Sequence, residues 1–191
     1  MSSSNAPRLS RRGFAFGMAG LTVTAACGNG VGNSNAATID ARVDATLTEM
    51  YAKYPNTVEI ANKANGMLIM PLITDAGLIF FGGAYGQGAL RIQGATVDYY
   101  SAISGTAGLQ IGAQQYAHVL FFMTQDALND FRRSSGWTAG ADIGYVVDAT
   151  GNSLSTDTTT LRSPVLAVVF GQAGLKFGAT VEGTKYTRII P

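Results

Sequence analysis

Glycines recur inside the β-prone part of this chain, and they restrict the folds that it can adopt. The 191 residues include 24 glycines, many of them among the aliphatic and aromatic residues that follow Gly66. A glycine within a strand weakens it, so its presence there marks a bulge, a sharp bend or the close approach of another backbone. Repeated glycines of this kind predict a strongly bent sheet.

The order of the expected elements gives the fold class α+β. An amphipathic helix over residues 38–54, with Thr38 as its N-cap, and a short helix over 57–64 precede a long β region. One further helix, capped by Thr124, interrupts the strands. Because this order lacks the regular strand–helix alternation of a parallel sheet, we expect a largely antiparallel, Gly-rich sheet with an N-terminal amphipathic helix and one inserted helix. A barrel-like closure is one outcome of such bending.

The β region divides into short β-prone runs separated by Gly, Pro or Asp. Gln93-Gly94 predicts a turn, and a polar loop is expected over 148–160. The expected strands before this turn are 67–70, 77–81 and 87–92. Those after it are a weakly alternating stretch over 96–113, then 116–122, 138–147, 164–170, 175–182 and 186–190.

Residues 1–26 have the composition of an export signal. Arg11 and Arg12 precede a charge-free, mildly apolar stretch that is too short to span a bilayer. A paired arginine before such a stretch is typical of twin-arginine signals, and an ordinary secretory signal with two arginines is the alternative. The sequence therefore predicts export to the periplasmic side of a bacterial membrane.

Cys27 is the only cysteine, and it directly follows the small residues Thr24-Ala25-Ala26. This arrangement resembles a lipobox, whose cysteine is acylated, although Thr24 stands where a larger aliphatic residue is usual. Acyl chains contribute about 0.8 kcal/mol per buried CH₂, so two or three of them would hold the protein on a membrane. Cleavage after Ala26 or near Ala36 would instead leave a soluble periplasmic protein. Residues 27–37 predict a flexible tether, and 38–191 the folded domain.

The formal net charge of +1 belongs to the export signal. Removal of residues 1–26 takes away three of the 13 basic residues and none of the 12 acidic ones, which leaves a net charge of −2. A chain without a basic block is a poor nucleic-acid ligand, so we expect no such partner. One histidine and one cysteine provide no ligand set for structural zinc or an iron–sulfur cluster, so we expect no metal and no cofactor.

No residue pattern predicts catalysis. The single histidine, His118, lies in the apolar run 116–122, where a lone histidine is usually structural. A Ser-His-Asp site would need it as the base, and no G-x-S-x-G motif is present. We expect that the chain is not an enzyme, and a hydrolase built on His118 is a minor alternative.

Several motifs of the β region resemble the SYLF domain, also called the Ysc84 family, and the resemblance extends over residues 58–189. The matching segments follow the family order and are Tyr85-Gly-Gln-Gly-Ala-Leu90, Tyr99-Tyr100-Ser101, 108–114, 122–124, Gly136-Trp137, 140–142, 164–171 and 182–185. The resemblance implies a binding module. Eukaryotic members resemble membrane adaptors that bind phosphoinositides, some fungal members bind actin filaments, and bacterial members resemble exported proteins or lipoproteins.

Lipid-headgroup binding requires clustered Lys and Arg side chains. The candidates are Lys185 and Arg188 in the matched C-terminal segment, together with Arg132 and Arg133, which also suit the C-terminus of the inserted helix. We therefore expect a non-catalytic cell-envelope lipoprotein that binds lipid or a membrane-associated partner. The alternative is a structural or protein-interaction module of the periplasm without lipid binding.

The N-terminal helix is a second element that could contact a membrane. Its acidic residues outnumber its basic ones, whereas helices that lie on membranes favour basic polar faces. We therefore expect this helix to cover the core. The residues compared are Asp40, Asp44 and Glu49 against Arg42 and Lys53.

Overall fold

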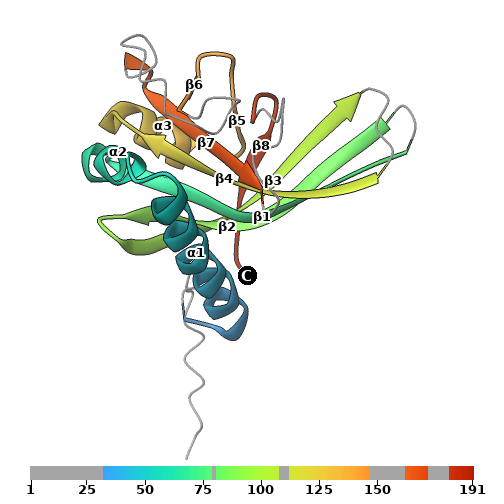
Figure 1. Cartoon of the computed structure of the whole chain (residues 1–191), viewed down its shortest axis with the longest axis horizontal. Coiled ribbons are helices and arrows are strands. Elements are labelled where there is room, and N and C mark those ends of the chain that lie inside the picture. The colour runs from blue at the N-terminus through green and yellow to red at the C-terminus, as the bar shows by residue number, and fades with distance from the viewer. Residues whose placement is uncertain (1–31, 79–80, 108–111, 147–161, 172–180) are drawn as a thin grey trace, which may run out of the picture.

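A single curled sheet organises the chain, with helices against both of its faces (Figure 1). The computed structural model describes residues 32–78, 81–107, 112–146, 162–171 and 181–191. The helices are α1 (Ser34–Lys53), α2 (Thr57–Lys63) and α3 (Gln125–Arg133). The strands are β1 (Gly66–Leu78), β2 (Phe81–Ile92), β3 (Ala95–Ala107), β4 (Gly112–Phe122), β5 (Trp137–Thr138), β6 (Gly144–Tyr145), β7 (Val165–Gly171) and β8 (Lys185–Ile189).

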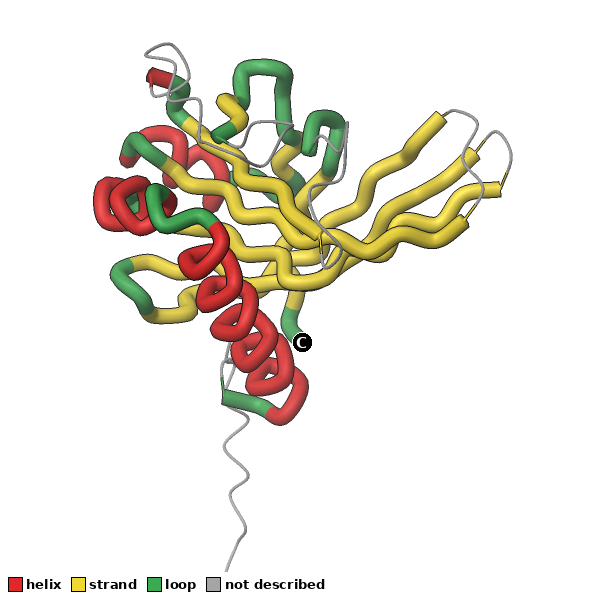
Figure 2. The backbone as a smooth tube through the Cα atoms, viewed as in Figure 1, coloured by secondary structure: helices red, strands yellow, loops and turns green. Residues whose placement is uncertain are grey.

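The described strands lie in the order β5-β8-β3-β2-β1-β4-β7-β6. All neighbouring pairs are antiparallel except β6 and β7. This confirms the predicted α+β fold class: a bent, largely antiparallel sheet with an N-terminal helix and one inserted helix. In Figure 2 the ends of β1, β2, β3 and β4 project beyond the part of the sheet that the helices cover.

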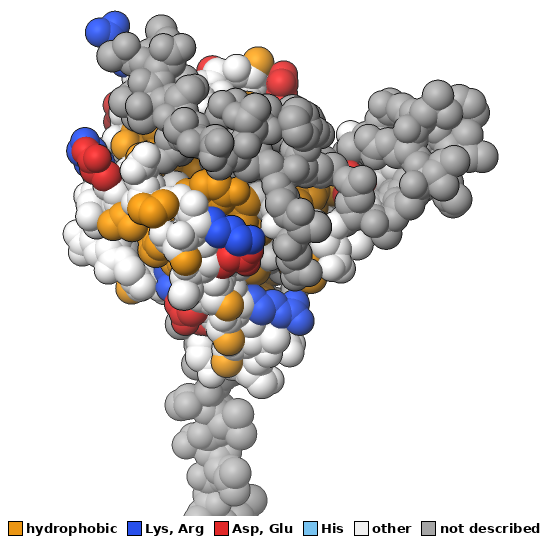
Figure 3. Space-filling view, in the orientation of Figure 1, with side chains coloured by type: hydrophobic (Ala, Val, Ile, Leu, Met, Phe, Trp, Pro, Cys, Tyr) orange, Lys and Arg blue, Asp and Glu red, His pale blue; other side chains and the backbone are white. Residues whose placement is uncertain are grey.

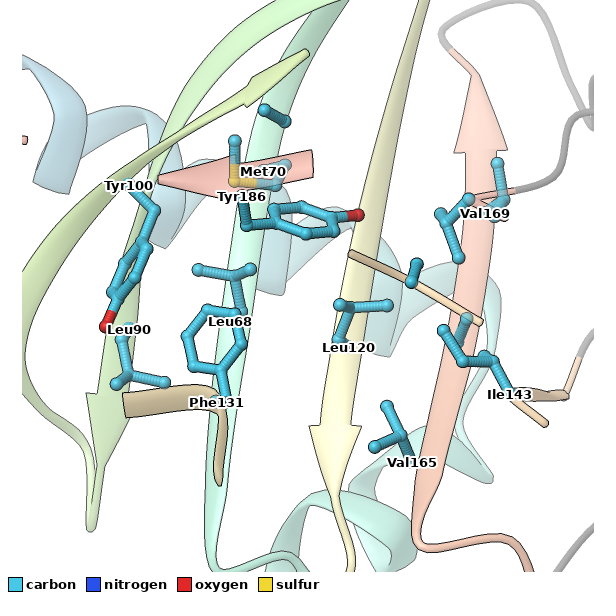
Figure 4. Close-up of a cluster of buried hydrophobic side chains, with 14 of the residues drawn as sticks. Leu68, Met70, Leu90, Tyr100, Leu120, Phe131, Ile143, Val165, Val169 and Tyr186 are labelled. Atoms are coloured by element: carbon cyan, nitrogen blue, oxygen red, sulfur yellow. The ribbon is translucent and has the colours of Figure 1, made fainter. Parts of the chain in front are cut away.

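A hydrogen bond across the concave face demonstrates the curl. Tyr186 Oη on β8 lies 2.7 Å from His118 Nε2 on β4, although three strands separate β8 from β4 in the sheet. In a flat sheet these strands would be about 19 Å apart, at about 4.8 Å per strand, which is too far for the two side chains to meet. Figure 4 shows the Tyr186 hydroxyl directed toward β4 among buried side chains of the concave face.

The two sheet faces carry separate cores. On the concave face Phe131 of α3 packs between aromatic rings, with centroids 4.7 Å from Tyr100 and 4.8 Å from Phe122. On the opposite face the apolar side of α1 packs mainly over β1 and β2, in one buried cluster that also includes residues of β4 and β7. The α1 and α2 residues buried there are Ala36, Ile39, Val43, Leu47, Met50 and Ile60.

The helix starts differ in part from those expected. The N-cap of α1 is Asn33, whose side chain accepts a 2.7 Å hydrogen bond from the backbone N–H of Ala36. The prediction of Thr38 as the cap was wrong, and residues 34–37 of the predicted tether are helical. Several small polar residues there are acceptable caps, so sequence alone could not choose among them. The caps of α2 and α3 are Asn56 and, as predicted, Thr124.

Strand lengths were the weakest prediction. The expected run 67–70 and the first two residues of the expected run 77–81 belong to the single strand β1, which continues through Pro71 with a register shift against both of its neighbours. Of the rest of that second run, residues 79–80 lie outside the described residues and Phe81 begins β2. A proline lacks the N–H that a regular ladder needs, so it stands at this bulge instead of ending the strand. The expected strand 138–147 does not form as one strand, because the described residues of this range contribute only to the two short strands β5 and β6.

The Gln93-Gly94 turn is confirmed, with positive φ angles of 52° and 81° that are typical of a two-residue hairpin turn. Strand β3 begins directly after it and ends at Ala107, within the weakly alternating stretch 96–113. The predicted loop 148–160 and most of the expected strand 175–182 lie outside the described residues.

Two glycines of β2 allow the sheet to bend at the bulge around Pro71 of β1. A Cβ at Gly88 would lie 2.0 Å from the carbonyl oxygen of Ile69, and one at Gly86 would lie 2.4 Å from that of Leu72. Both contacts are with the backbone of β1, which cannot move aside like a flexible side chain. This is the close approach that glycines inside the strands predict.

Substitution Gly88→Ala should therefore destabilise the fold by about 2 kcal/mol or more, because the added methyl overpacks against backbone. Thermal unfolding should show a midpoint several degrees lower. Gly105→Ala is the matched control, since nothing lies within 4 Å of a Cβ there. Equal melting midpoints for the two variants would contradict a close approach at Gly88.

Candidate ligand-binding surface

Two of the predicted binding residues meet at one buried carboxylate. Arg132, in the last turn of α3, and Arg188, on β8, place their Nη2 atoms 3.8 and 3.5 Å from Asp98 Oδ2 on β3. The Asp98 side chain is 8% exposed, whereas those of Arg132 and Arg188 are 42% and 47% exposed. The carboxylate therefore lies beneath two guanidinium groups that remain open to solvent.

The sheet register positions Arg188. It pairs with Tyr100 of β3, and its guanidinium carbon lies 6.0 Å from the centre of the Tyr100 ring. Its Nη2 also donates a 3.0 Å hydrogen bond to the backbone oxygen of Arg132, one of the carbonyls at the end of α3 that no helical N–H can reach. Arg188 therefore joins α3 to β8 while part of its guanidinium stays exposed.

The other two candidates differ in position. Arg133 follows Arg132 in the last turn of α3, is exposed, and has no ion-pair partner among the described residues. Lys185 lies on the opposite face of β8 from Arg188, because side chains alternate along a strand, and its Cε packs over Gly136. We call Arg132, Arg133 and Arg188 the arginine patch, which excludes Lys185.

One carboxylate cannot neutralise two guanidinium groups, so the arginine patch keeps excess positive charge around Asp98. Guanidinium groups bind phosphate and carboxylate through paired N–H donors. The arrangement is therefore suited to holding an anion at the surface. The proposed acylation site Cys27 and the export residues Arg11 and Arg12 lie outside the described residues.

Sequence reasoning missed Asp98 as the centre of this surface. A lone acidic residue between Val97 and Tyr99 in a β-prone run is a usable signal, because a buried carboxylate needs partners. The sequence could not name those partners, which lie 34 and 90 positions further along the chain.

The acidic residues of α1 have partners of their own. Asp40 accepts hydrogen bonds from Thr96 Oγ1 and Tyr99 Oη, both 2.8 Å long, and Asp44 accepts one of 2.6 Å from Arg91. Burial, followed by the hydrogen bond to Asp40, raises the pKa of Tyr99 to about 12. These carboxylates therefore bind α1 to β2 and β3, so the acidic excess of this helix is directed largely at the protein itself.

His118 and Tyr186 are buried inside the curl, at 1% exposure each. Burial lowers the pKa of His118 to about 3, so its imidazole is neutral at physiological pH. Burial likewise raises the pKa of Tyr186 well above its usual value. Two neutral, buried partners form a structural contact, as expected for a lone strand histidine.

The described part of the chain also contains no group of three His, Cys, Asp or Glu side chains placed to hold a metal ion. None of the helices in this part is long and apolar enough to cross a membrane.

The buried histidine makes stability depend on pH. Between the unfolded pKa of about 6.5 and the folded value, the unfolded chain binds one more proton, so the free energy of unfolding falls as pH drops below about 6.5. From pH 7 to 5.5 the parent should lose about 1 kcal/mol more than a His118→Gln variant, as measured by urea unfolding. Equal losses in the two proteins would show that His118 does not become protonated on unfolding.

Comparison with known proteins gives one family match, over the C-terminal part of the chain. Residues 103–188 match the family model described as Ysc84, Las17-binding protein actin regulator. The matched segment runs from β3 through β8 and contains the whole arginine patch, whereas the predicted resemblance began earlier, at residue 58. No curated protein matches the chain. Residues 103–188 are therefore similar to the Ysc84 (SYLF) family, the resemblance that the motifs of the β region predict.

Proposed function

We propose that this protein is a non-catalytic binding module of the bacterial cell envelope, and that its arginine patch binds the anionic headgroup of a membrane lipid. The observation that carries the proposal is the convergence of Arg132 and Arg188, both half-exposed, on the single buried carboxylate of Asp98. The description of the matching family names a binding protein, which supports a binding role.

Acylation of Cys27, the second part of the proposal, would fix which end of the domain lies near the membrane. Asn33, the N-cap of α1, donates a 2.6 Å hydrogen bond to the carbonyl oxygen of Pro191, so the C-terminus lies at the start of α1. Ile190 beside it is 74% exposed. The six residues that follow Cys27, up to and including Asn33, span at most about 21 Å, so an acylated Cys27 would keep this end of the domain near the membrane.

Vesicle flotation tests the headgroup proposal. The exported chain with Cys27→Ser, which removes the acyl anchor, should float with vesicles rich in phosphatidylglycerol and much less with pure phosphatidylcholine. Each basic residue near an anionic surface contributes about 1 kcal/mol, so Arg132→Gln and Arg133→Gln should each weaken binding about fivefold. Added salt should weaken it further, since exposed charges are screened.

Lys185→Gln is the matched control, because Lys185 lies on the other face of β8 and should leave flotation unchanged. Arg133 has no ion-pair partner among the described residues, so its replacement tests charge without disturbing the fold. Equal flotation of the Arg133→Gln and Lys185→Gln variants would contradict the arginine patch as the lipid site. Absence of flotation with any vesicle, together with cross-linking to one envelope protein, would favour the protein-interaction alternative.

A further inference from the structure

A half-open cavity of about 280 Å³ lies between α1 and the sheet, on the face opposite the arginine patch. It lies where the register of β1 shifts around Pro71, next to Ala45 and Thr46 of α1. Its lining comes from α1, β1, β4 and β7 and consists of Arg42, Ala45, Thr46, Glu49, Pro71, Leu72, Ala117, Phe170 and Gly171.

The strands give this cavity an apolar floor. Phe170 and Ala117 are 1% and 8% exposed, and Leu72 and Pro71 are half-buried beside them. Figure 3 shows hydrophobic side chains next to basic and acidic ones on the face of the molecule that α1 crosses. The cavity therefore combines an apolar surface with a charged edge.

The charged edge has one cation that is not neutralised. Glu49 Oε1 lies 2.6 Å from Lys53 Nζ, so its charge is paired within α1. Arg42, two helical turns before Glu49, is exposed and forms no ion pair with any described residue. The local charge at this edge favours an anionic group next to Arg42.

We propose that this groove binds a medium-chain fatty acid, with the carboxylate at Arg42 and the alkyl chain along Leu72, Ala117 and Phe170. An apolar cavity of about 150 Å³ accepts benzene, so about 280 Å³ suits a chain of roughly ten carbons. A single carboxylate matches a single free guanidinium, and an alkyl chain matches the apolar floor. The inference is independent of the arginine patch, which lies on the other face of the sheet.

Titration calorimetry of the exported chain with decanoate, below its micellar concentration, tests the groove. Decanoate should bind with a stoichiometry of one, and decylamine, which has the opposite charge, should bind about tenfold more weakly. Arg42→Gln should weaken decanoate binding about tenfold, the typical effect of losing a hydrogen bond between charged groups. Lys63→Gln is the matched control, because Lys63 pairs with Glu59 on α2, away from the groove.

A second pair of variants tests the position of the alkyl chain. Ala45→Leu should fill the groove and reduce decanoate binding at least tenfold, whereas Ala52→Leu makes the same change elsewhere on α1 and should have no effect. Leucine is a strong helix former, so both variants should keep the parent's melting midpoint. Absence of decanoate binding would overturn the proposal, and so would equal affinity in the parent, Arg42→Gln and Ala45→Leu proteins.

Discussion

The hydrogen bond between Tyr186 and His118 holds together strands that the sheet order separates by three others. It is 2.7 Å long, lies between two buried and uncharged side chains, and crosses the concave interior. Because Arg188 follows Tyr186 by two positions, it projects to the same face of β8 and reaches Asp98 and the end of α3. The arginine patch therefore depends on the curl that this contact maintains.

The curl also gives the two faces of the sheet different environments. The concave face is filled by aromatic rings around Phe131. Its charged groups, Asp98 and the arginine patch, lie at the edge of this core, where α3 ends. The opposite face is covered by α1, whose carboxylates hold the β2–β3 hairpin. The covering is incomplete at the Pro71 bulge, and the groove beside Arg42 forms there. One irregularity of β1 thus accounts both for the glycines that face it and for the groove.

Local signals in the sequence were sufficient for the fold class but not for its details. Apolar periodicity and the Thr124 cap predicted α1 and α3, and glycines within strands predicted the bend that Gly86 and Gly88 allow. The predicted end of a strand at residue 70 was wrong, because β1 continues through Pro71. A proline at a bulge and a proline after a strand end have the same local sequence. Arg132 and Arg188 were candidates by residue type, but their shared partner Asp98 follows from long-range packing that no local pattern encodes.

A double-mutant cycle tests the central contact most directly. The free energies of unfolding would be measured for the parent, Tyr186→Phe, His118→Leu and the double variant, all at pH 7. Contacting residues give coupling energies of about 0.5–3 kcal/mol, and we expect a value of about 1 kcal/mol or more for this buried pair. Single-variant effects that add within about 0.3 kcal/mol would contradict a hydrogen bond that closes the sheet.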